Sequence, residues 1–514
     1  MFTRDELIAA AGASPPGTGA SPPGTGVQPL GGELPAHFAG GAIDSRAVRR
    51  GELFVALKGE HTDGHLYIPQ AIEAGAAAIL CARPHEEAQA RGIPQIVVRD
   101  PLDVLQRLAG NHLRRQPSTR VIAVTGSNGK TGTKEAIAAL LGHLAPTLKT
   151  EGNLNTETGM PLTLLRLAPE HQFAVLEMGA QWVGEITALC RIAPPDIAVV
   201  TVVGPEHLEF FGSLENVAKG ESEAVAALTA DGVAILNDDD PAVRAMAKQT
   251  KAGVVTYGHR PAAMVRALRV SGDPLTGLRF TLSYGDQRER VQLHIPGAHA
   301  ITTALAAAAV ALTCGMTLPA IAAALGEIRP AKRRGEIKPA VNGATLVDDS
   351  YNANRQSAIA AVELLKGAKL AAGGRRWFVF GDMLELGAYS PAEHAAVGEA
   401  AAGAVDELVL VGSDVRAAAQ AARAAGMAAS RVHLFAAPLS NRAELAAARD
   451  KAAALVRDAL RPGDVVLVKG SLGVGMDSIV TALHDHTTPQ HPHADGAPPT
   501  QRPRRAAARA ARRA

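Results

Sequence analysis

Short apolar runs recur along this chain, and most of them end in glycine or in a polar cluster. They lie at residues 53–57, 77–81, 95–98, 121–124, 173–176, 197–203, 344–347, 376–380, 407–411 and 465–468. Runs of this length that are rich in β-branched residues predict β-strands. Helical patterns separate many of them, at residues 3–11, 68–76, 101–114, 134–144, 162–167 and 300–312. Strands that alternate with helices predict an α/β fold with mostly parallel sheets.

The alternation divides into three parts, which agrees with a length of 514 residues being too great for one core. We expect a small α/β N-terminal domain over residues 1–116 and a central, mostly parallel-sheet domain over 117–330. A C-terminal Rossmann-like α/β domain should follow over 331–485. Residues 12–26 repeat the heptapeptide Gly-Ala-Ser-Pro-Pro-Gly-Thr, and residues 486–514 are low-complexity and basic. We expect a disordered insert and a disordered tail, because neither segment can bury apolar surface.

The apolar run 121–124 leads into Thr125-Gly126-Ser127-Asn128-Gly129-Lys130-Thr131 and then into a helical pattern. This order predicts a phosphate-binding loop of the P-loop ATPase kind. Backbone N–H groups at a helix N-terminus surround the phosphates in such a loop, lysine reaches them, and a threonine hydroxyl binds Mg²⁺. The full Walker pattern is not met, because Val124 stands five positions before Gly129. The alternative is a strand–turn–helix corner with a solvated lysine, and the β-branched run directly before the loop argues against it.

Two further polar residues follow strands of the predicted central domain. Glu177 comes after the run 173–176, and His207 comes shortly after the run 197–203. Ligands of parallel sheets bind at the carboxyl ends of the strands, so both side chains should lie beside the phosphate loop. A carboxylate and an imidazole there can ligate Mg²⁺ and help to neutralise phosphate. Each residue alone is equally well explained as a cap or as a hydrogen-bonded loop residue, but together with Lys130 they favour a metal–nucleotide site.

Other polar clusters have two open explanations. Residues 150–161 are dense in amides, which suits either a polar substrate or a capped loop. Residues 44–46, Asp-Ser-Arg, either hold a polar ligand or form an ordinary turn. In the third part of the chain, polar clusters at 348–354, 381–383 and 469–471 again follow strands. We therefore expect a cleft that closes between domains over a nucleotide, an acid and an amine.

Composition excludes several classes of protein. A net charge of +2 with 20% charged residues argues against a dedicated nucleic-acid binder, and we interpret the basic tail as solvated. The longest apolar run, 304–312, is too short to span a bilayer, and the N-terminus has no apolar signal segment. Cys81, Cys190 and Cys314 are widely separated and odd in number, which is typical of reduced thiols. We expect a cytoplasmic protein without membrane insertion.

From about residue 41 to residue 483, a series of motifs occurs in a fixed order. They are residues 44–46, 125–131 with Lys134-Glu135, 152–155, 159–165, 176–180, 207–209, 348–354, 381–387 and 468–471. In these motifs the chain resembles the Mur ligase family, and among its members those that add a dipeptide. The resemblance implies an ATP- and Mg²⁺-dependent, ADP-forming ligase of peptidoglycan precursor synthesis. It would join D-alanyl-D-alanine to UDP-N-acetylmuramoyl-tripeptide through an acyl phosphate, as a monomer and without a protein nucleophile.

The resemblance also implies roles for individual residues. Lys130, Glu177 and His207 would be catalytic. The ATP-binding residues would be Thr125, Gly126, Ser127, Asn128, Gly129, Lys130, Thr131, His299, Arg334 and Asp349. Those bound to the UDP-sugar peptide would be Asp44, Ser45, Arg46, Asn153, Asn155 and Thr156, with Asn352 and Asn354 on the dipeptide side. The metal ligands would be Thr131 and Glu177 for one Mg²⁺ and His207 for a second.

Several positions depart from the family pattern. Thr156 follows Asn155 where the family has a second asparagine, and Gly132 interrupts a run of threonines. On the adenine side, Ala300 and Thr303 stand where the family has asparagines, so the adenine contacts stay open.

The sharpest departure lies fourteen residues after His207, where the family has a carbamylated lysine that binds the second Mg²⁺. This chain has Glu221 there, and Lys219 lies two positions earlier. Two residues turn a helix by about 200°, so Lys219 should face away from the site. We expect Glu221 to supply the negative charge to the metal site, through a bridging water. The alternative is that Glu221 is a solvated helix residue and that His207 and substrate hold the metal alone.

Rival functions also stay open. The Mur ligase that adds the third amino acid carries an Asp-Asn-Pro-Arg element that is not found in the third domain here. A folate polyglutamate synthetase is a more distant possibility. From a different class, the Ala300 and Thr303 changes would permit an inert nucleotide-binding or scaffolding protein, against which Lys130, Glu177 and His207 argue. The third residue of the peptide substrate is left undetermined.

Overall fold

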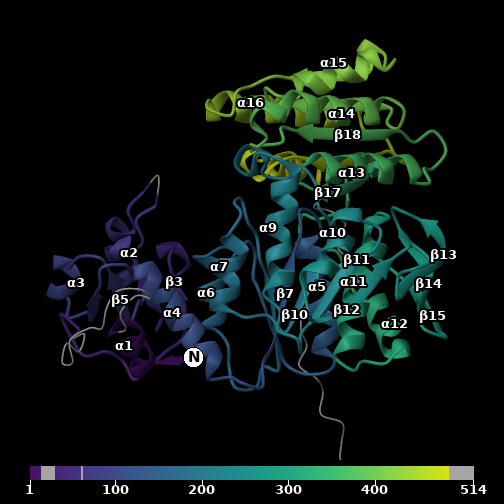
Figure 1. Ribbon diagram of the computed structural model, residues 1–514. Coiled ribbons are helices and arrows are strands. Elements are labelled where there is room, and N and C mark those ends of the chain that lie inside the picture. The colour runs from purple at the N-terminus through teal and green to yellow at the C-terminus, as the bar shows by residue number, and fades with distance from the viewer. Residues whose placement is uncertain (13–28, 60–61, 486–514) are drawn as a thin grey trace, which may run out of the picture.

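The computed structural model describes residues 1–12, 29–59 and 62–485, and these form three bodies in chain order, each around its own main sheet (Figure 1). The predicted tail, 486–514, lies outside the described residues, as does the predicted insert except for its first residue. Gly12 is not part of a disordered insert but the last residue of the first helix. The predicted α/β class with mostly parallel sheets is confirmed.

The N-terminal body is built on a parallel sheet with strand order β3-β4-β5-β6. Strand β4 is buried along its whole length, as its unbroken apolar run predicts. Helix α4 begins where the Asp100 side chain accepts hydrogen bonds from the N–H groups of Leu102 and Asp103. The elements are β1 (Phe2–Thr3), α1 (Arg4–Gly12), β2 (His37–Phe38), β3 (Gly41–Ala42), β4 (Leu53–Val55), α2 (Ile68–Glu73), β5 (Ala78–Cys81), α3 (Glu86–Ala90), β6 (Gln95–Val97) and α4 (Pro101–Arg114).

The central sheet has strand order β15-β14-β13-β12-β11-β10-β7-β9-β8 and is parallel from β8 to β13. Its strands are β7 (Arg120–Thr125), β8 (Thr147–Lys149), β9 (Phe173–Glu177), β10 (Ile197–Val200), β11 (Val233–Asn237), β12 (Gly253–Gly258), β13 (Val265–Asp273), β14 (Gly277–Tyr284) and β15 (Gln287–Gln292). Its helices are α5 (Lys130–Gly142), α6 (Gly159–Leu164), α7 (Glu185–Ile192), α8 (Leu208–Phe211), α9 (Leu214–Ala226), α10 (Pro241–Ala245), α11 (His299–Thr313) and α12 (Leu318–Glu327).

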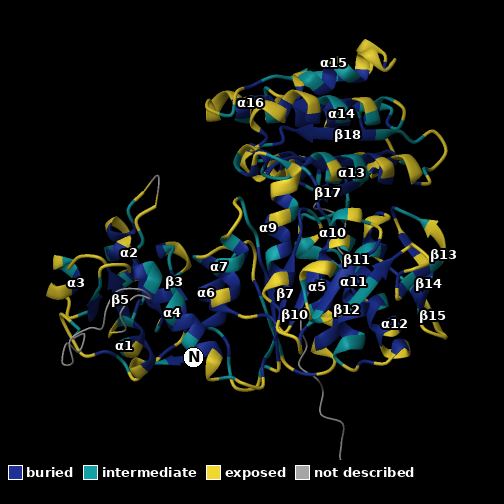
Figure 2. Ribbon diagram, in the orientation of Figure 1, coloured by how far each residue is buried: buried dark blue, intermediate teal, exposed yellow. Residues whose placement is uncertain are grey.

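Alternate residues of β7 pack on opposite sides of the central sheet. Val121 and Ala123 join a core with α7 and α9, whereas Ile122 and Val124 join a core with α5 and α11. The apolar run 121–124 of β7 is therefore buried on both faces of the sheet, as is typical of parallel sheets (Figure 2). This double burial fixes the strand that carries the phosphate loop.

The sequence patterns did not predict the antiparallel edge of the central sheet. Strands β13, β14 and β15 pair antiparallel with one another. The register of β13 shifts between Leu268 and Ser271, and Arg269 within it has a positive φ of 54°. Such a bulge interrupts the alternation of apolar and polar residues within β13, which made this strand hard to predict from period-two patterns.

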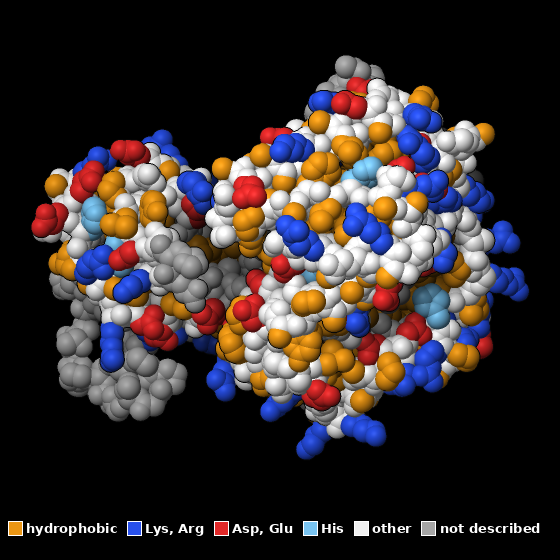
Figure 3. Space-filling view, turned by 90° about the horizontal axis from the view of Figure 1, so that it is seen from above, with side chains coloured by type: hydrophobic (Ala, Val, Ile, Leu, Met, Phe, Trp, Pro, Cys, Tyr) orange, Lys and Arg blue, Asp and Glu red, His pale blue; other side chains and the backbone are white. Residues whose placement is uncertain are grey.

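The third sheet has strand order β16-β17-β21-β18-β19-β20, with β16 antiparallel at one edge. Its elements are β16 (Glu336–Pro339), β17 (Thr345–Asp349), α13 (Arg355–Gly367), β18 (Arg376–Gly381), α14 (Ser390–Ala402), β19 (Glu407–Val411), α15 (Arg416–Ala424), β20 (Val432–Phe435), α16 (Arg442–Ala459), β21 (Val465–Lys469) and α17 (Asp477–Leu483). This body lies over one end of the central sheet, while the N-terminal body projects to one side (Figures 1 and 3).

Candidate active site

The loop after β7 turns at two glycines in the left-handed region. Gly126 has a φ of 123° and Gly129 a φ of 82°. A Cβ atom on Gly126 would lie 2.1 Å from Thr201 Oγ1, so glycine is required there for space as well as for conformation. Helix α5 begins directly at Lys130, four residues earlier than the helical pattern predicts. The predicted strand–loop–helix order is confirmed, and the N–H groups at the start of α5 form an anion-binding terminus.

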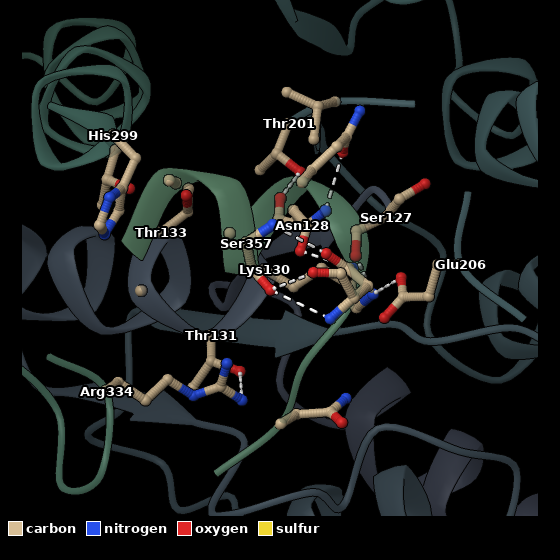
Figure 4. Close-up of a pocket in the computed structure, with 18 of the residues that line it drawn as sticks. Ser127, Asn128, Lys130, Thr131, Thr133, Thr201, Glu206, His299, Arg334 and Ser357 are labelled. Carbon is tan, nitrogen blue, oxygen red and sulfur yellow. Dashed lines mark hydrogen bonds and ion pairs between the residues drawn. The ribbon is translucent and has the colours of Figure 1, made fainter. Parts of the chain in front are cut away.

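Lys130 lies in the loop with its ammonium group among carboxylates (Figure 4). Its Nζ donates to the Gly126 carbonyl at 2.7 Å and to Glu206 Oε2 at 2.9 Å. Burial by itself lowers the pKa of Lys130, but the negative charges of Glu206 and Glu221 outweigh it and raise the pKa. The lysine is therefore held in its charged form at the position where phosphate would bind.

Glu177 ends β9, the strand next to β7, and one of its carboxylate oxygens accepts no hydrogen bond among the described residues. Its Oε1 accepts a hydrogen bond from Asn155 Nδ2 at 2.9 Å. Its Oε2 is buried without a hydrogen-bond partner among the described residues, and Lys134 Nζ is 3.7 Å away. A buried carboxylate oxygen with no donor is costly unless a cation or another ligand pairs with it. Glu177 therefore meets the requirement for a hard divalent cation, which prefers oxygen ligands.

His207 lies at the N-terminus of α8 with a positive φ of 51° and contacts two carboxylates. Its Nδ1 pairs with Glu385 of the third body, and its Nε2 is 3.8 Å from Glu206 Oε1. Burial lowers the pKa of His207, but the hydrogen bond to Glu385 and the charge of Glu206 more than compensate and raise it. The ring is thereby oriented with Nδ1 toward the third body and Nε2 toward the site.

Glu221 is buried in α9, whereas Lys219 is exposed. The Glu221 carboxylate accepts a hydrogen bond from Thr125 at the end of β7. Burial raises the pKa of Glu221, and the nearby Lys130 charge opposes this rise. Glu221 is thus not a solvated helix residue, and the helix register does turn Lys219 away from the loop, as expected.

A cleft with a volume of about 1080 Å³ extends from the phosphate loop to the third body. In the third body, Arg334 Nη2 donates to Thr131 Oγ1 at 3.1 Å, and the guanidinium stacks on Tyr351 (Figure 4). Asp349 Oδ2 accepts from Lys469 Nζ at 2.7 Å. The cleft is also lined by Asn155, Thr156, Glu177, His207, His299, Asn352 and Asn354. Residues from two bodies therefore share one nucleotide-sized space.

Family models match the chain in the same three-part order. The Mur ligase family catalytic domain matches residues 37–112, the Mur ligase middle domain matches 124–311, and the Mur ligase glutamate ligase domain matches 333–472. This chain belongs to the Mur ligase family. The resemblance drawn from the sequence motifs is confirmed.

Relatives of known name align with most of this Mur ligase. A UDP-N-acetylmuramoyl-tripeptide–D-alanyl-D-alanine ligase of Mycobacterium bovis is 39% identical and aligns over 86% of this chain and 91% of its own length. The ligase of the same name from Escherichia coli is 38% identical, over 87% and 93% respectively.

Two solved structures share the arrangement. MurF from Acinetobacter baumannii superimposes with a TM-score of 0.76 at 30% identity, covering 93% of this Mur ligase and 98% of that chain. MurF from Thermotoga maritima, solved in complex with ADP, gives a TM-score of 0.72 at 28% identity, covering 86% and 96%.

Some predicted site residues of this Mur ligase lie away from the cleft. Asp44 and Arg46 pair with each other on the N-terminal body, and the Ser45 hydroxyl donates to Gln70. Asn153 is exposed and is not among the cleft-lining residues. Thr125 and Glu221 lie beneath the loop and not in the cleft wall. The structure thus brings most of the predicted nucleotide residues to the cleft wall, apart from Thr125 and Gly126, but not all of the predicted peptide residues.

Both adenine-side departures, Ala300 and Thr303, lie in the cleft wall. His299 and Thr303 line the cleft, and Thr303 also lies near Gly132, which would place a Cβ 3.8 Å from its methyl group. Ala300 is 1% exposed and packs in the core with α11. The alanine therefore has a packing role in addition to its place at the cleft.

Sequence reasoning missed four residues that contact the predicted site. They are Glu206, Gln356, Glu385 and Lys469. Glu385 and Lys469 belong to motifs that were recognised in the sequence but given no role. Glu206 is adjacent to His207, so a carboxylate next to a predicted ligand was the available signal. Gln356 gave no signal, because it follows the last motif residue, Asn354, on the next helix.

The predicted metal ligands do not form a preassembled cluster. Within the described ranges, no three acidic, histidine or cysteine side chains are grouped so that they could hold a metal ion by themselves. Glu177 Oε2 and the Thr131 hydroxyl nevertheless suit Mg²⁺, which commonly takes one or two protein ligands and completes its shell with phosphates and water. None of the helices in the described parts has the length and apolar character needed to cross a membrane.

Proposed function

We propose that this Mur ligase joins D-alanyl-D-alanine to UDP-N-acetylmuramoyl-tripeptide with hydrolysis of ATP to ADP, in the synthesis of peptidoglycan precursors. The main support for this function is the alignment of the chain with ligases of that name, over more than nine-tenths of their length. The function is also supported by two structural features, a phosphate loop with Lys130 and a buried Glu177 oxygen without a hydrogen-bond donor among the described residues. Both features are needed for an ATP-dependent ligase.

The reaction divides into two displacements. A carboxylate oxygen of the tripeptide forms a bond to the γ-phosphorus of ATP, and the bond to ADP breaks. The amine of D-alanyl-D-alanine then attacks the acyl carbon, phosphate leaves, and the amine proton is released. Both steps need positioning and neutralisation of phosphate charge and no protein nucleophile. Lys130 supplies a fixed positive charge, and the N–H groups at the start of α5 supply donors.

The proposed roles of the remaining residues come from the family resemblance. We assign residues 125–131, His299, Arg334 and Asp349 to ATP, and Asn155 and Thr156 to the peptide side of the cleft. We assign Asp44, Ser45, Arg46 and Asn153 to the distant UDP-sugar end of the substrate, which agrees with their position outside the cleft. Asn352 and Asn354 are assigned to the dipeptide side. The Asn354 side chain also caps α13 and contacts Asn128, which limits the hydrogen bonds it has left for substrate.

One Mg²⁺ would be held by Thr131 and Glu177 and a second by His207, all of which line the cleft. When bound, the ion would neutralise phosphate oxygens and orient the γ-phosphate. Glu221 would add a permanent negative charge from beneath the loop, through Thr125 or through water.

We also propose domain boundaries at 116/117 and 330/331, which fall between α4 and β7 and between α12 and β16. We also propose that the protein acts as a monomer. A cytoplasmic location follows from the proposed use of ATP.

Phosphate release tests the function directly. Purified protein with ATP and Mg²⁺ should release phosphate only when UDP-N-acetylmuramoyl-tripeptide and D-alanyl-D-alanine are both present. Tripeptides that end in lysine or in diaminopimelate should be compared, because the third residue is undetermined. Turnover at a comparable rate with a free amino acid in place of the dipeptide would refute the assignment.

A further inference from the structure

The side chain of Asn128, in the phosphate loop, is held by two residues of the third body. Its Nδ2 donates to Gln356 Oε1 at 2.8 Å, and its Oδ1 accepts from Asn354 Nδ2 at 2.8 Å. The Asn128 carbonyl accepts from Thr201 Oγ1 at 2.5 Å (Figure 4). The tip of the loop is thus fixed to the central body by its backbone and to the third body by its amide.

Gly204 provides the space into which Gln356 inserts. A Cβ atom on Gly204 would lie 2.2 Å from Gln356 Oε1, and its three nearest neighbours all belong to the Gln356 amide. The backbone of Gly204 is not in the left-handed region, so alanine needs no change of conformation there. The N–H and carbonyl of Gly204 both bond the Ser127 hydroxyl of the phosphate loop. A methyl group at this position would therefore displace only a flexible side chain.

We propose that Gln356 is a positioning residue that couples docking of the third body to the conformation of the phosphate loop. This inference rests on the proposed nucleotide site. Gln356 lines the cleft beside Asn128, and its amide oxygen is held by the Asn128 side chain, through which we expect it to act. Docking of the third body would then strengthen nucleotide binding at the loop. Nucleotide binding would favour docking by the same factor, because coupling between two equilibria is reciprocal.

The structure offers two independent ways to break the same contact. Gln356→Ala removes the acceptor, and Gly204→Ala displaces it while leaving Gln356 in the chain. Each should weaken ADP binding, measured by calorimetry, roughly fivefold, the typical effect of one neutral hydrogen bond. The double variant should bind ADP within about twofold of either single variant, because a contact can be lost only once. Gly142→Ala, at the end of α5, is the matched control, since a Cβ there meets nothing within 4 Å.

Docking supplies a second readout. Small-angle scattering should show that ADP compacts the wild type and Gly142→Ala more than either contact variant. Thermal midpoints of the variants should match the wild type, which separates coupling from general destabilisation.

Single variants that bind ADP as the wild type does, or a double variant weakened roughly 25-fold as independent effects would predict, would overturn the inference. A wild type that binds no ADP would instead refute the nucleotide site and the proposed function with it.

Discussion

The Thr125 hydroxyl donates a 2.5 Å hydrogen bond to Glu221 Oε2 directly beneath the phosphate loop. Thr125 is fully buried at the end of β7, and Glu221 is 4% exposed in α9. A carboxylate is therefore fixed next to the strand that carries Lys130, at a position where the family has a carbamylated lysine. The charge of Glu221 needs no added carbon dioxide, which makes its role testable.

We expect Glu221→Ala to lower turnover roughly 10- to 100-fold, the effect typical of losing a group that supports a metal or phosphate site. Glu221→Gln keeps an acceptor for Thr125 but removes the charge, so it should fall between alanine and wild type. Added bicarbonate should change none of these rates. Initial rates of phosphate release, with and without bicarbonate, provide the measurement.

The matched control is Lys219→Ala, which removes an exposed lysine from the same helix and should leave turnover unchanged. Loss of activity in this variant, together with stimulation of the wild type by bicarbonate, would place the carbamate on Lys219 and show the assignment of Glu221 to be wrong.

Lys130→Ala should reduce turnover roughly 10³-fold, because an aligned charge at the transferring phosphate is lost. The fold should persist, since Glu206, the ion-pair partner of the lysine, lines the cleft and can be solvated. Circular dichroism and single-turnover rates would measure the two effects. Lys251→Ala, which removes an exposed lysine, is the control. An unfolded Lys130→Ala protein would show that the lysine is structural.

Glu385 orients His207 from the third body, so Glu385→Ala should lower kcat by about tenfold, as typical for partners of a metal-site histidine. Tyr389→Phe is the matched comparison, because Tyr389 Oη bonds the Gly212 carbonyl across the same interface without contacting His207. It should lower kcat less than twofold, roughly the effect of one exposed hydrogen bond. Equal losses in the two variants would assign the effect to docking alone.

The N-terminal body is tied to the central one through buried Glu6. Glu6 accepts hydrogen bonds from the N–H and hydroxyl of Thr3 and pairs with His112 Nδ1 at 2.9 Å. His112 Nε2 lies 3.0 Å from the Leu167 carbonyl. Burial raises the pKa of Glu6, but these hydrogen bonds lower it below its ordinary value of 4.5. Stability from Glu6 is therefore present above about pH 4.5 and is lost as the pH falls through the lowered pKa.

Glu6→Gln should lower the free energy of unfolding by roughly 1–2 kcal/mol at pH 7. The difference from wild type should shrink as the pH falls below 4.5 and the wild-type carboxyl becomes protonated through its lowered pKa. Urea unfolding at both pH values measures it. Asp5→Asn, at an exposed position on the same helix, should have no effect at either pH. If the difference in free energy of unfolding between Glu6→Gln and wild type did not change with pH, the packing of the Glu6 side chain and not its charge would be what stabilises the protein.

Local patterns were sufficient to predict the strand, loop and helix that carry Lys130. The β-branched run before the loop is buried on both faces, and Gly126 and Gly129 have the positive φ values that the turn requires. The three-part α/β order was predicted from the periodicity of neighbouring residues. The family was predicted from short motifs, which are also made of neighbouring residues. Prediction from local patterns failed at β13, because the bulge at Arg269 breaks the periodicity on which such prediction depends.

The sequence by itself determined that Lys130, Glu177 and His207 follow strands of the central sheet and lie on the side where the carboxyl ends of its parallel strands meet. Only the tertiary structure decided what these residues contact. His207 meets Glu385, 178 positions away, and Asn128 meets Gln356, 228 positions away. Such contacts depend on how one folded body docks on another, and docking is set by the shape and charge of finished surfaces. No periodicity in the chain encodes it, so the partners that tune the site appear only once the bodies are assembled.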